Sequence, residues 1–172
     1  MKKLNRSFFQ RPTVQVSKDL LGKVLKIGNC SGRINEVEAY IGQEDPACHA
    51  ARGKTERNKV MFGPAGHLYV YFTYGMYHCA NIVTENEGFP AAVLIRSIEP
   101  LEGKGLMEKR RGKAKNLADG PGKLCIALGI SKDAHNGIGA HVYDDGYSPQ
   151  KIKSSPRIGI KVGLDKNWRF YY

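Results

Sequence analysis

Two glutamates two residues apart are the first candidates for chemistry in this sequence. In the segment RINEVEAYI (33–41), Ile34, Glu36, Glu38 and Tyr40 occupy alternate positions. Successive side chains of a β-strand point to opposite faces, so these four would share one face and the apolar residues at 37, 39 and 41 would face a core. A carboxylate between a second carboxylate and an aromatic ring tends to have the raised pKa that a general acid or base needs. The alternative is an exposed face with solvated acids.

An arginine and a histidine add two polar groups. Arg96 interrupts the apolar segment AAVLIRSI (91–98), so we expect its guanidinium to reach a carboxylate, either as a structural ion pair or as the partner of a catalytic glutamate. His49 lies in the loop segment DPACHAARGK, with no second histidine at the spacing of metal ligands. A lone loop histidine of this kind is typical of an ordinary polar contact.

Four of the nine tyrosines are crowded into LYVYFTYGMYHCAN (68–81). On the strand that this segment predicts, Leu68, Val70 and Phe72 share a core face, because alternate side chains point the same way. The opposite face carries Tyr69, Tyr71 and Thr73. Aromatic rings with polar tips suit the wall of a pocket or a half-exposed surface.

The glycine after this strand predicts a hairpin turn. Gly75 at the first central position of a two-residue loop is typical of a type II′ turn, which would place Tyr74, Met76 and Tyr77 at or beside the tip. An apolar tip can act as a wedge that unstacks neighbouring base pairs. It can also fold back on the core of its own domain, and the residues alone favour that second possibility.

The charge of the chain points to its partners. The 172 residues carry a formal net charge of +11, which indicates nucleic acid, an anionic membrane or acidic ligands as partners. The alternative is a generic basic protein that its lysines keep soluble. The segment GKGLMEKRRGKAKN (103–116) is the most basic and would bind phosphates or be a solvated charge run. In DGPGKLCIALG, a glycine-rich loop leads into a helix with Lys123 in its first turn, a natural phosphate site. The spacing is not that of a Walker A loop.

The elements that position these residues form hairpins and do not alternate with long helices. We therefore predict an α+β fold with an antiparallel sheet in a single domain spanning residues 1–172. The predicted helices are 12–21, a short one at 56–61, 103–116 and 121–129. The predicted strands are 23–27, 33–41 after a turn at 29–32, 67–73, 78–84, 91–98, and two pieces, RIGIKV and WRFYY, within 156–172.

Composition and cysteine spacing set further expectations. Hydrophobic residues make up 41% of the chain, no stretch is long and apolar enough to span a bilayer, and no secretory signal follows the first lysines. We expect an intracellular protein, which in a bacterium would lie in the cytoplasm or nucleoid. The four cysteines have no CxxC pair, which argues against a structural zinc site.

Taken in order, five segments resemble the alkyladenine (3-methyladenine, or methylpurine) DNA glycosylase family, the kind without a helix-hairpin-helix or an iron–sulfur cluster. They are EVEAYIGQEDPACHA, MFGPAGHLYVYFTYGMYHCANIV, AAVLIRSIEPLEG, GPGKLCIALGI and PRIGI. The resemblance runs from about Ser7 to near the C-terminus. It implies one domain around a curved, open-barrel-like antiparallel sheet, with short peripheral helices and a protruding hairpin. It also implies an enzyme that flips alkylated or deaminated purines out of duplex DNA and hydrolyses the N-glycosidic bond without lyase activity.

The resemblance assigns roles to individual residues. Glu38 matches the general base, and Arg96 matches the arginine that holds the attacking water. The residues matched to binding of the extruded base are Tyr40, His49, Tyr71, Asn81 and Ile158. Tyr74 matches the wedge, with Met76 and Tyr77 against neighbouring bases. The expected phosphate contacts are Lys123, Lys132 and Arg52, with Arg110 and Arg111 from the basic segment.

The expected partner is double-stranded DNA that contains damaged purines, bound by a monomer without a metal or organic cofactor and without a membrane. Two other functions stay open. One is a damaged-DNA-binding module that has lost catalysis, which an intact Glu38 and Arg96 argue against. The other is a hydrolase of free nucleosides, for which the hairpin tip and the net charge would have no use.

Overall fold

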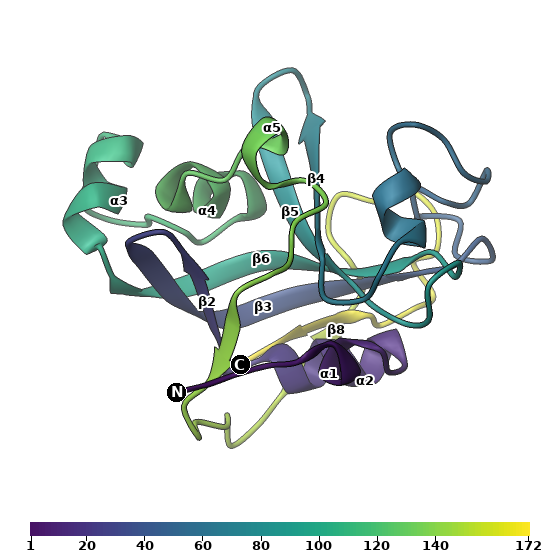
Figure 1. Cartoon of the computed structure of the whole chain (residues 1–172), viewed down its shortest axis with the longest axis horizontal. Coiled ribbons are helices and arrows are strands. Elements are labelled where there is room, and N and C mark those ends of the chain that lie inside the picture. The colour runs from purple at the N-terminus through teal and green to yellow at the C-terminus, as the bar shows by residue number, and fades with distance from the viewer.

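A computed structural model describes all 172 residues, and its strands form one open antiparallel sheet (Figure 1). The strands are β1 (Lys2–Lys3), β2 (Val24–Ile27), β3 (Cys30–Ile41), β4 (Leu68–Thr73), β5 (Tyr77–Val83), β6 (Ala91–Glu102), β7 (Val142–Asp144), β8 (Lys153–Ser155) and β9 (Arg169–Tyr171). Their order is β1-β7-β2-β3-β6-β5-β4, and β9 joins β8 to β3. The α+β prediction is confirmed.

The helices are short and lie around the sheet (Figure 1). They are α1 (Arg6–Phe9), α2 (Thr13–Leu20), α3 (Lys104–Arg111), α4 (Pro121–Leu128), α5 (Lys132–His135) and a 3₁₀ turn, η1 (Lys59–Phe62). The predicted helix over 103–116 ends early, because Gly112 adopts a left-handed φ of 65° that stops it. No helix has the length and apolar character that crossing a membrane would need.

Two apolar clusters hold the fold together. The larger has 27 buried residues and includes Val16 and Leu20 of α2 and Leu124 and Leu128 of α4, which pack on the sheet. The smaller has six members: Cys48, Ala50, Met61, Tyr69, Val83 and Ala92. It lies between the loop after β3 and strands β4, β5 and β6, so the loop that carries His49 is packed onto the sheet.

Strand β3 does not alternate along its whole length. Ile34 pairs with Ile98, but the register shifts on both sides of Glu36, which pairs with Ser97. Ile34 and Val37 are consequently both buried in the larger cluster, although they are three residues apart. The prediction that Ile34 shares a face with Glu38 is wrong, because a bulge breaks the period of two.

Other boundaries differ from prediction for local reasons. The β2–β3 turn lies at Gly28–Asn29 and not at 29–32, since Ile27 already pairs with Cys30 and Gly28 has a φ of 54°. RIGIKV (157–162) forms no strand and continues as irregular backbone to Gly163. WRFYY does supply a strand, β9, which pairs with β3 at Glu36–Glu38. Strands β1, β7 and β8 and helices α1 and α5 were not predicted.

The β4–β5 hairpin projects from the sheet (Figure 1). Tyr74 and Gly75 have φ values of 53° and 63°, and the Met76 amide donates to the Thr73 carbonyl at 3.1 Å. Positive φ at both central residues is the pattern of a type I′ turn, so the type II′ prediction is wrong. Phe72 was expected in the core but is 46% exposed, because the hairpin extends beyond the core.

Candidate active site

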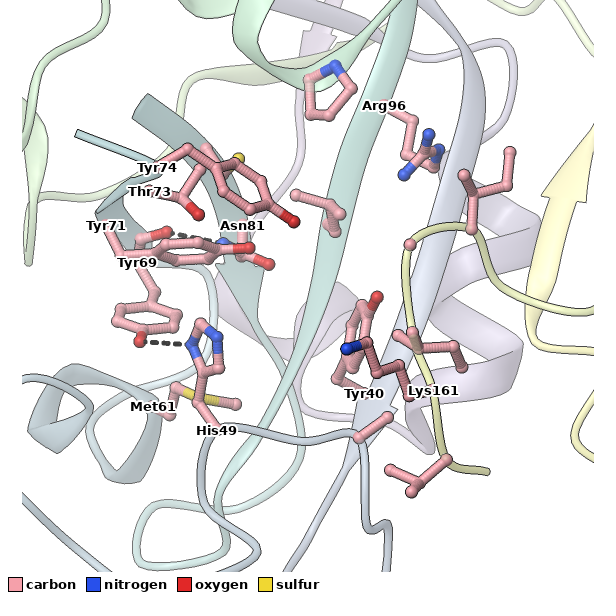
Figure 2. Close-up of a pocket in the computed structure, with 18 residues that line it drawn as sticks. Tyr40, His49, Met61, Tyr69, Tyr71, Thr73, Tyr74, Asn81, Arg96 and Lys161 are labelled. Atoms are coloured by element: carbon pink, nitrogen blue, oxygen red, sulfur yellow. Dashed lines mark hydrogen bonds between the residues drawn. The ribbon is translucent and has the colours of Figure 1, made fainter. Parts of the chain in front are cut away.

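A cavity of about 450 Å³ opens along the β4–β5 hairpin. In Figure 2, Tyr71 and His49 line one side and Tyr40 lies across an open space from them. The structure brings seven of the predicted residues into the lining: Tyr40, His49, Tyr71, Tyr74, Asn81, Arg96 and Ile158. The face of Tyr69, Tyr71 and Thr73 was expected to form either a pocket wall or a half-exposed surface, and the structure has it as a pocket wall, since all three residues line the cavity.

One wall is built from the rings of His49, Tyr69 and Tyr71, which meet edge to face or at a tilt. His49 Nδ1 lies 2.9 Å from the Tyr69 hydroxyl, and its ring centre lies 4.5 Å from that of Tyr71 at 72°. Burial, together with the positive charge of Arg57, lowers the pKa of His49, so the imidazole is neutral near pH 7. Burial also raises the pKa of Tyr71. This wall is therefore aromatic and uncharged.

The opposite wall is Tyr40, whose hydroxyl donates to Glu38 Oε2 at 2.8 Å. Burial and the charge of Glu38 raise the pKa of Tyr40, so its phenol keeps the proton. Behind the ring, the guanidinium carbon of Arg157 lies 4.6 Å from the ring centre. The ring is therefore fixed at both its hydroxyl and its face.

Glu38 is fully buried, with no exposed surface, directly behind the cavity. Its Oε1 accepts from the main-chain amide of Ile158 at 2.7 Å and lies 3.3 Å from Arg96 Nη1. Together with the Tyr40 hydroxyl, all three polar partners are donors, so they stabilise a negatively charged carboxylate. A general base needs that state, held in a fixed position.

Arg96 is itself held by a second glutamate. Its Nε donates to Glu36 Oε1 at 2.8 Å, and the same oxygen accepts from Arg169 Nε at 2.7 Å. Burial would raise the pKa of Glu36, but the hydrogen bonds from Arg169 and Arg96 outweigh it and lower the pKa below its usual value. Arg96 thus bridges Glu36 and Glu38. The prediction that it reaches a carboxylate is confirmed.

A buried ion pair anchors the segment that covers Glu38. Arg157 and Asp45 are both fully buried, with Nη1–Oδ2 and Nη2–Oδ1 distances of 2.6 and 2.8 Å. Arg157 Nη1 also donates to the Ala39 carbonyl at 2.9 Å. Because Ile158 follows Arg157 directly, this pair sets the position of the amide that contacts Glu38. Neither residue was predicted, since no local pattern links positions so far apart in the chain.

The hairpin tip is exposed next to the cavity. Tyr74 is 81% exposed and also lines the cavity, Met76 is 64% exposed, and Tyr77 is 39% exposed. The tip therefore does not fold back on the core. Tyr77 packs against the first turn of α4, where a Cβ on Gly122 would lie 3.0 Å from its ring.

The predicted phosphate contacts differ in their exposure and in the partners that they already have within the protein. Lys123 in the first turn of α4 pairs with Asp119 at 3.0 Å, and both are about half exposed. Lys132, at the start of α5, and Arg52, in the loop after β3, are both exposed residues. Arg110 is exposed, and its guanidinium donates to the Ala127 carbonyl of α4 at 3.0 Å. Arg111 lies near the end of α3, and a phosphate role for either arginine stays a prediction.

No group of three or more His, Cys, Asp or Glu side chains could hold a metal ion. Several residues that line the cavity were not predicted from the sequence. The unpredicted residues include Met61, Cys79, Leu94, Pro121, Lys161 and Val162. Alternation could have found two of them, since Cys79 precedes Asn81 by two positions and Leu94 precedes Arg96 by two. Lys161 carries no such signal, because its segment is irregular.

An aromatic cavity with a carboxylate held by three donors behind it, in a chain with a net charge of +11, suits a flat ring and a general base. The model of the family described as methylpurine-DNA glycosylase matches residues 7–172. The chain belongs to the methylpurine-DNA glycosylase family, and it is thereby a DNA-binding hydrolase of base excision repair.

Similar proteins agree with the family. A protein of Sodalis glossinidius is 56% identical over 172 residues, covering 97% of this chain and 95% of that protein. One of Methanocella arvoryzae is 50% identical over 183 residues, covering 98% and 91%. One of Wolbachia from Brugia malayi is 52% identical over 173 residues, covering 97% and 95%. All three are provisionally named 3-methyladenine DNA glycosylase.

Proposed function

We propose that the protein removes alkylated and deaminated purines from duplex DNA by hydrolysing the N-glycosidic bond, and that it leaves an abasic site without cutting the strand. The observation that carries this proposal is Glu38, fully buried behind an aromatic cavity and held by donors from Tyr40, Arg96 and Ile158. A base inside a duplex cannot enter such a cavity, so the nucleotide has to flip out of the stack.

The flipped base would lie between Tyr40 and the pair His49 and Tyr71, stacked on their rings. Asn81 donates its Nδ2 to the Tyr69 carbonyl at 3.0 Å, which leaves Oδ1 as the atom free to face the cavity. In the proposed pose this side chain crowds the exocyclic amine of normal guanine. Discrimination then comes from a clash, and not from a contact that only the lesion makes.

In the proposed reaction, water attacks the anomeric carbon, its proton passes to Glu38, and the bond between carbon and base nitrogen breaks with its electron pair on the base. Arg96 holds the water, and the negative charge of Glu38 stabilises the developing positive charge on the sugar. A purine alkylated on a ring nitrogen is cationic and leaves as a neutral base. Hypoxanthine is neutral and leaves poorly, and protonation of the leaving base would supply the further help that it needs.

Tyr74 would fill the gap in the base stack, with Met76 and Tyr77 against the neighbouring bases. Its high exposure at the end of a projecting hairpin supports this role. Tyr77 packs on the first turn of α4, which brings the amides and Lys123 of that turn close to the hairpin as a phosphate site. Lys132 and Arg52 are proposed as further phosphate contacts.

A duplex with one hypoxanthine tests the function under single-turnover conditions. We expect strand breaks at the lesion only after alkali, because an abasic site is alkali-labile and the protein itself does not cleave. Breaks before alkali would contradict the absence of lyase activity. Binding without any release, from this duplex and from one with 7-methylguanine, would identify a binding module without catalysis.

Replacing Tyr74 by alanine should weaken duplex binding and slow base release, since a stacking ring contributes about 1–3 kcal/mol per base. The melting temperature should not change, because the side chain is largely exposed. Fluorescence anisotropy and single-turnover release measure the two effects. Tyr74→Phe is the matched control, because it keeps the ring and should behave like the wild type. If the alanine variant binds and releases hypoxanthine normally, Tyr74 is not the wedge.

A further inference from the structure

One arginine guanidinium lies against each of the two aromatic walls of the cavity. The Arg157 guanidinium carbon lies 4.6 Å from the ring centre of Tyr40, and that of Arg57 lies 5.6 Å from the ring centre of Tyr71. Both distances are within the range of a cation–π interaction. The two rings line the cavity but the two arginines do not. The charge of Arg157 is balanced by Asp45, whereas Arg57 forms no ion pair, so the cation–π contact with Tyr71 is the one that leaves a net positive charge at a wall.

The lining itself carries cations and no acid. Of its 18 residues, Arg96 and Lys161 are basic and none is Asp or Glu. Arg96 is neutralised by Glu36 and Glu38, whereas Lys161 forms no ion pair or side-chain hydrogen bond. Figure 2 shows Lys161 on the same side of the cavity as Tyr40. Glu38, the carboxylate behind the cavity, is already occupied by three donors.

This arrangement distinguishes bases by charge. A cationic alkylpurine is attracted by electron-rich rings, but rings that already face a guanidinium attract it less, and the Lys161 ammonium repels it. A neutral purine with an oxygen at C6, such as hypoxanthine, meets no repulsion and offers Lys161 an acceptor. Cationic bases still leave readily because their glycosidic bonds are weak. The effect of the charges therefore appears in the ratio of the release rate of a cationic base to that of a neutral base.

We propose that Lys161 and Arg57 are specificity-determining residues that shift the preference of the cavity toward neutral damaged purines and away from cationic ones. The inference rests on the proposed function, because it assumes that a flipped purine occupies the cavity. It concerns side chains of this chain that lie around the base and not the catalytic carboxylate.

Two duplexes that differ only in the lesion, 7-methylguanine or hypoxanthine, test the proposal. Single-turnover rates at saturating enzyme give the ratio of 7-methylguanine release to hypoxanthine release for each protein. Dividing the ratio for a variant by that for the wild type cancels the intrinsic lability of each lesion. We expect Lys161→Ala and Arg57→Ala each to raise this ratio roughly twofold to fivefold, and the double variant to show about the product of the two.

Two matched controls remove a positive charge at a similar distance from a ring outside the cavity. Lys54 Nζ lies 5.6 Å from the ring centre of Phe62, and Lys166 Nζ lies 5.5 Å from that of Trp168. Neither ring lines the cavity. Lys54→Ala and Lys166→Ala should leave the ratio unchanged, because they change only the overall charge.

The outcomes separate the inference from the function beneath it. An equal loss of rate on both duplexes would assign Lys161 and Arg57 to the DNA backbone and overturn the inference, as would an unchanged ratio or a shift in the controls. Release of neither lesion by the wild type would overturn the proposed function and the inference together. Normal release with Glu38 dependence but no change in ratio would overturn the inference alone.

Discussion

Glu38→Gln is expected to slow base release by about 100- to 10,000-fold, the range for removal of a general base. Glutamine is nearly the same size, so it can still accept from the Ile158 amide, but it cannot take a proton from water. Single-turnover release from the hypoxanthine duplex measures the loss. Duplex affinity should stay close to that of the wild type, since Glu38 is buried behind the cavity and does not touch the DNA backbone in the proposed complex.

A charge control distinguishes catalysis from a general effect of one lost carboxylate. Glu102 lies at the far end of β6 and pairs with Lys26 at 3.1 Å on the surface. Glu102→Gln should release hypoxanthine at the wild-type rate. A Glu38→Gln protein that is correctly folded and works within threefold of the wild type would remove Glu38 from the reaction.

Asp45→Asn is expected to produce the largest loss of stability, about 3–5 kcal/mol, because it leaves the Arg157 guanidinium buried without a counter-ion. That is a large part of the total stability of a domain of this size. Urea denaturation measures the change in the free energy of unfolding. At urea concentrations below the unfolding transition, the variant should also release bases more slowly than the wild type. The reason is that Arg157 positions the Ile158 amide, which donates to Glu38.

The matched control is Asp165→Asn in the same part of the structure. Asp165 pairs with Lys166 at 3.2 Å but its side chain is 74% exposed, so water replaces the partner and no measurable change in stability is expected. If Asp45→Asn unfolds at the same urea concentration as the wild type, the buried pair does not anchor this segment.

The regular parts of the site could be predicted from the sequence. Alternation alone put Glu38 and Tyr40 on one face of β3, where the Tyr40 hydroxyl contacts Glu38. It also put Tyr71 on the polar face of β4, as a pocket wall or a half-exposed surface, and the structure has it lining the cavity. The resemblance then gave the roles that alternation cannot give. The same rule failed at Ile34, because the bulge beside it depends on how β3 pairs with β6. It also failed at Phe72, because the β4–β5 hairpin extends beyond the core and leaves this side chain exposed.

The irregular parts could not be predicted, and the reason is physical. The backbone from Ile158 to Gly163 forms no helix or strand. It is anchored by Arg157, which binds Asp45 across more than a hundred residues of chain. The turn at Tyr74 needs a left-handed tyrosine, a conformation that local preference gives to glycine. Lys161 lines the cavity only because that irregular segment passes there.

The two sides of the cavity differ in how freely they can evolve. Tyr69 and Met61, on the hairpin side, belong at the same time to the smaller apolar cluster, so a change of shape there also costs folding free energy. Ile158 and Val162, on the other side, are about half exposed and their side chains support no core. Substitutions along the 158–162 segment can therefore change the range of accepted bases at little cost in stability. Substitutions at Tyr69 and Met61 that change this range also destabilise the fold.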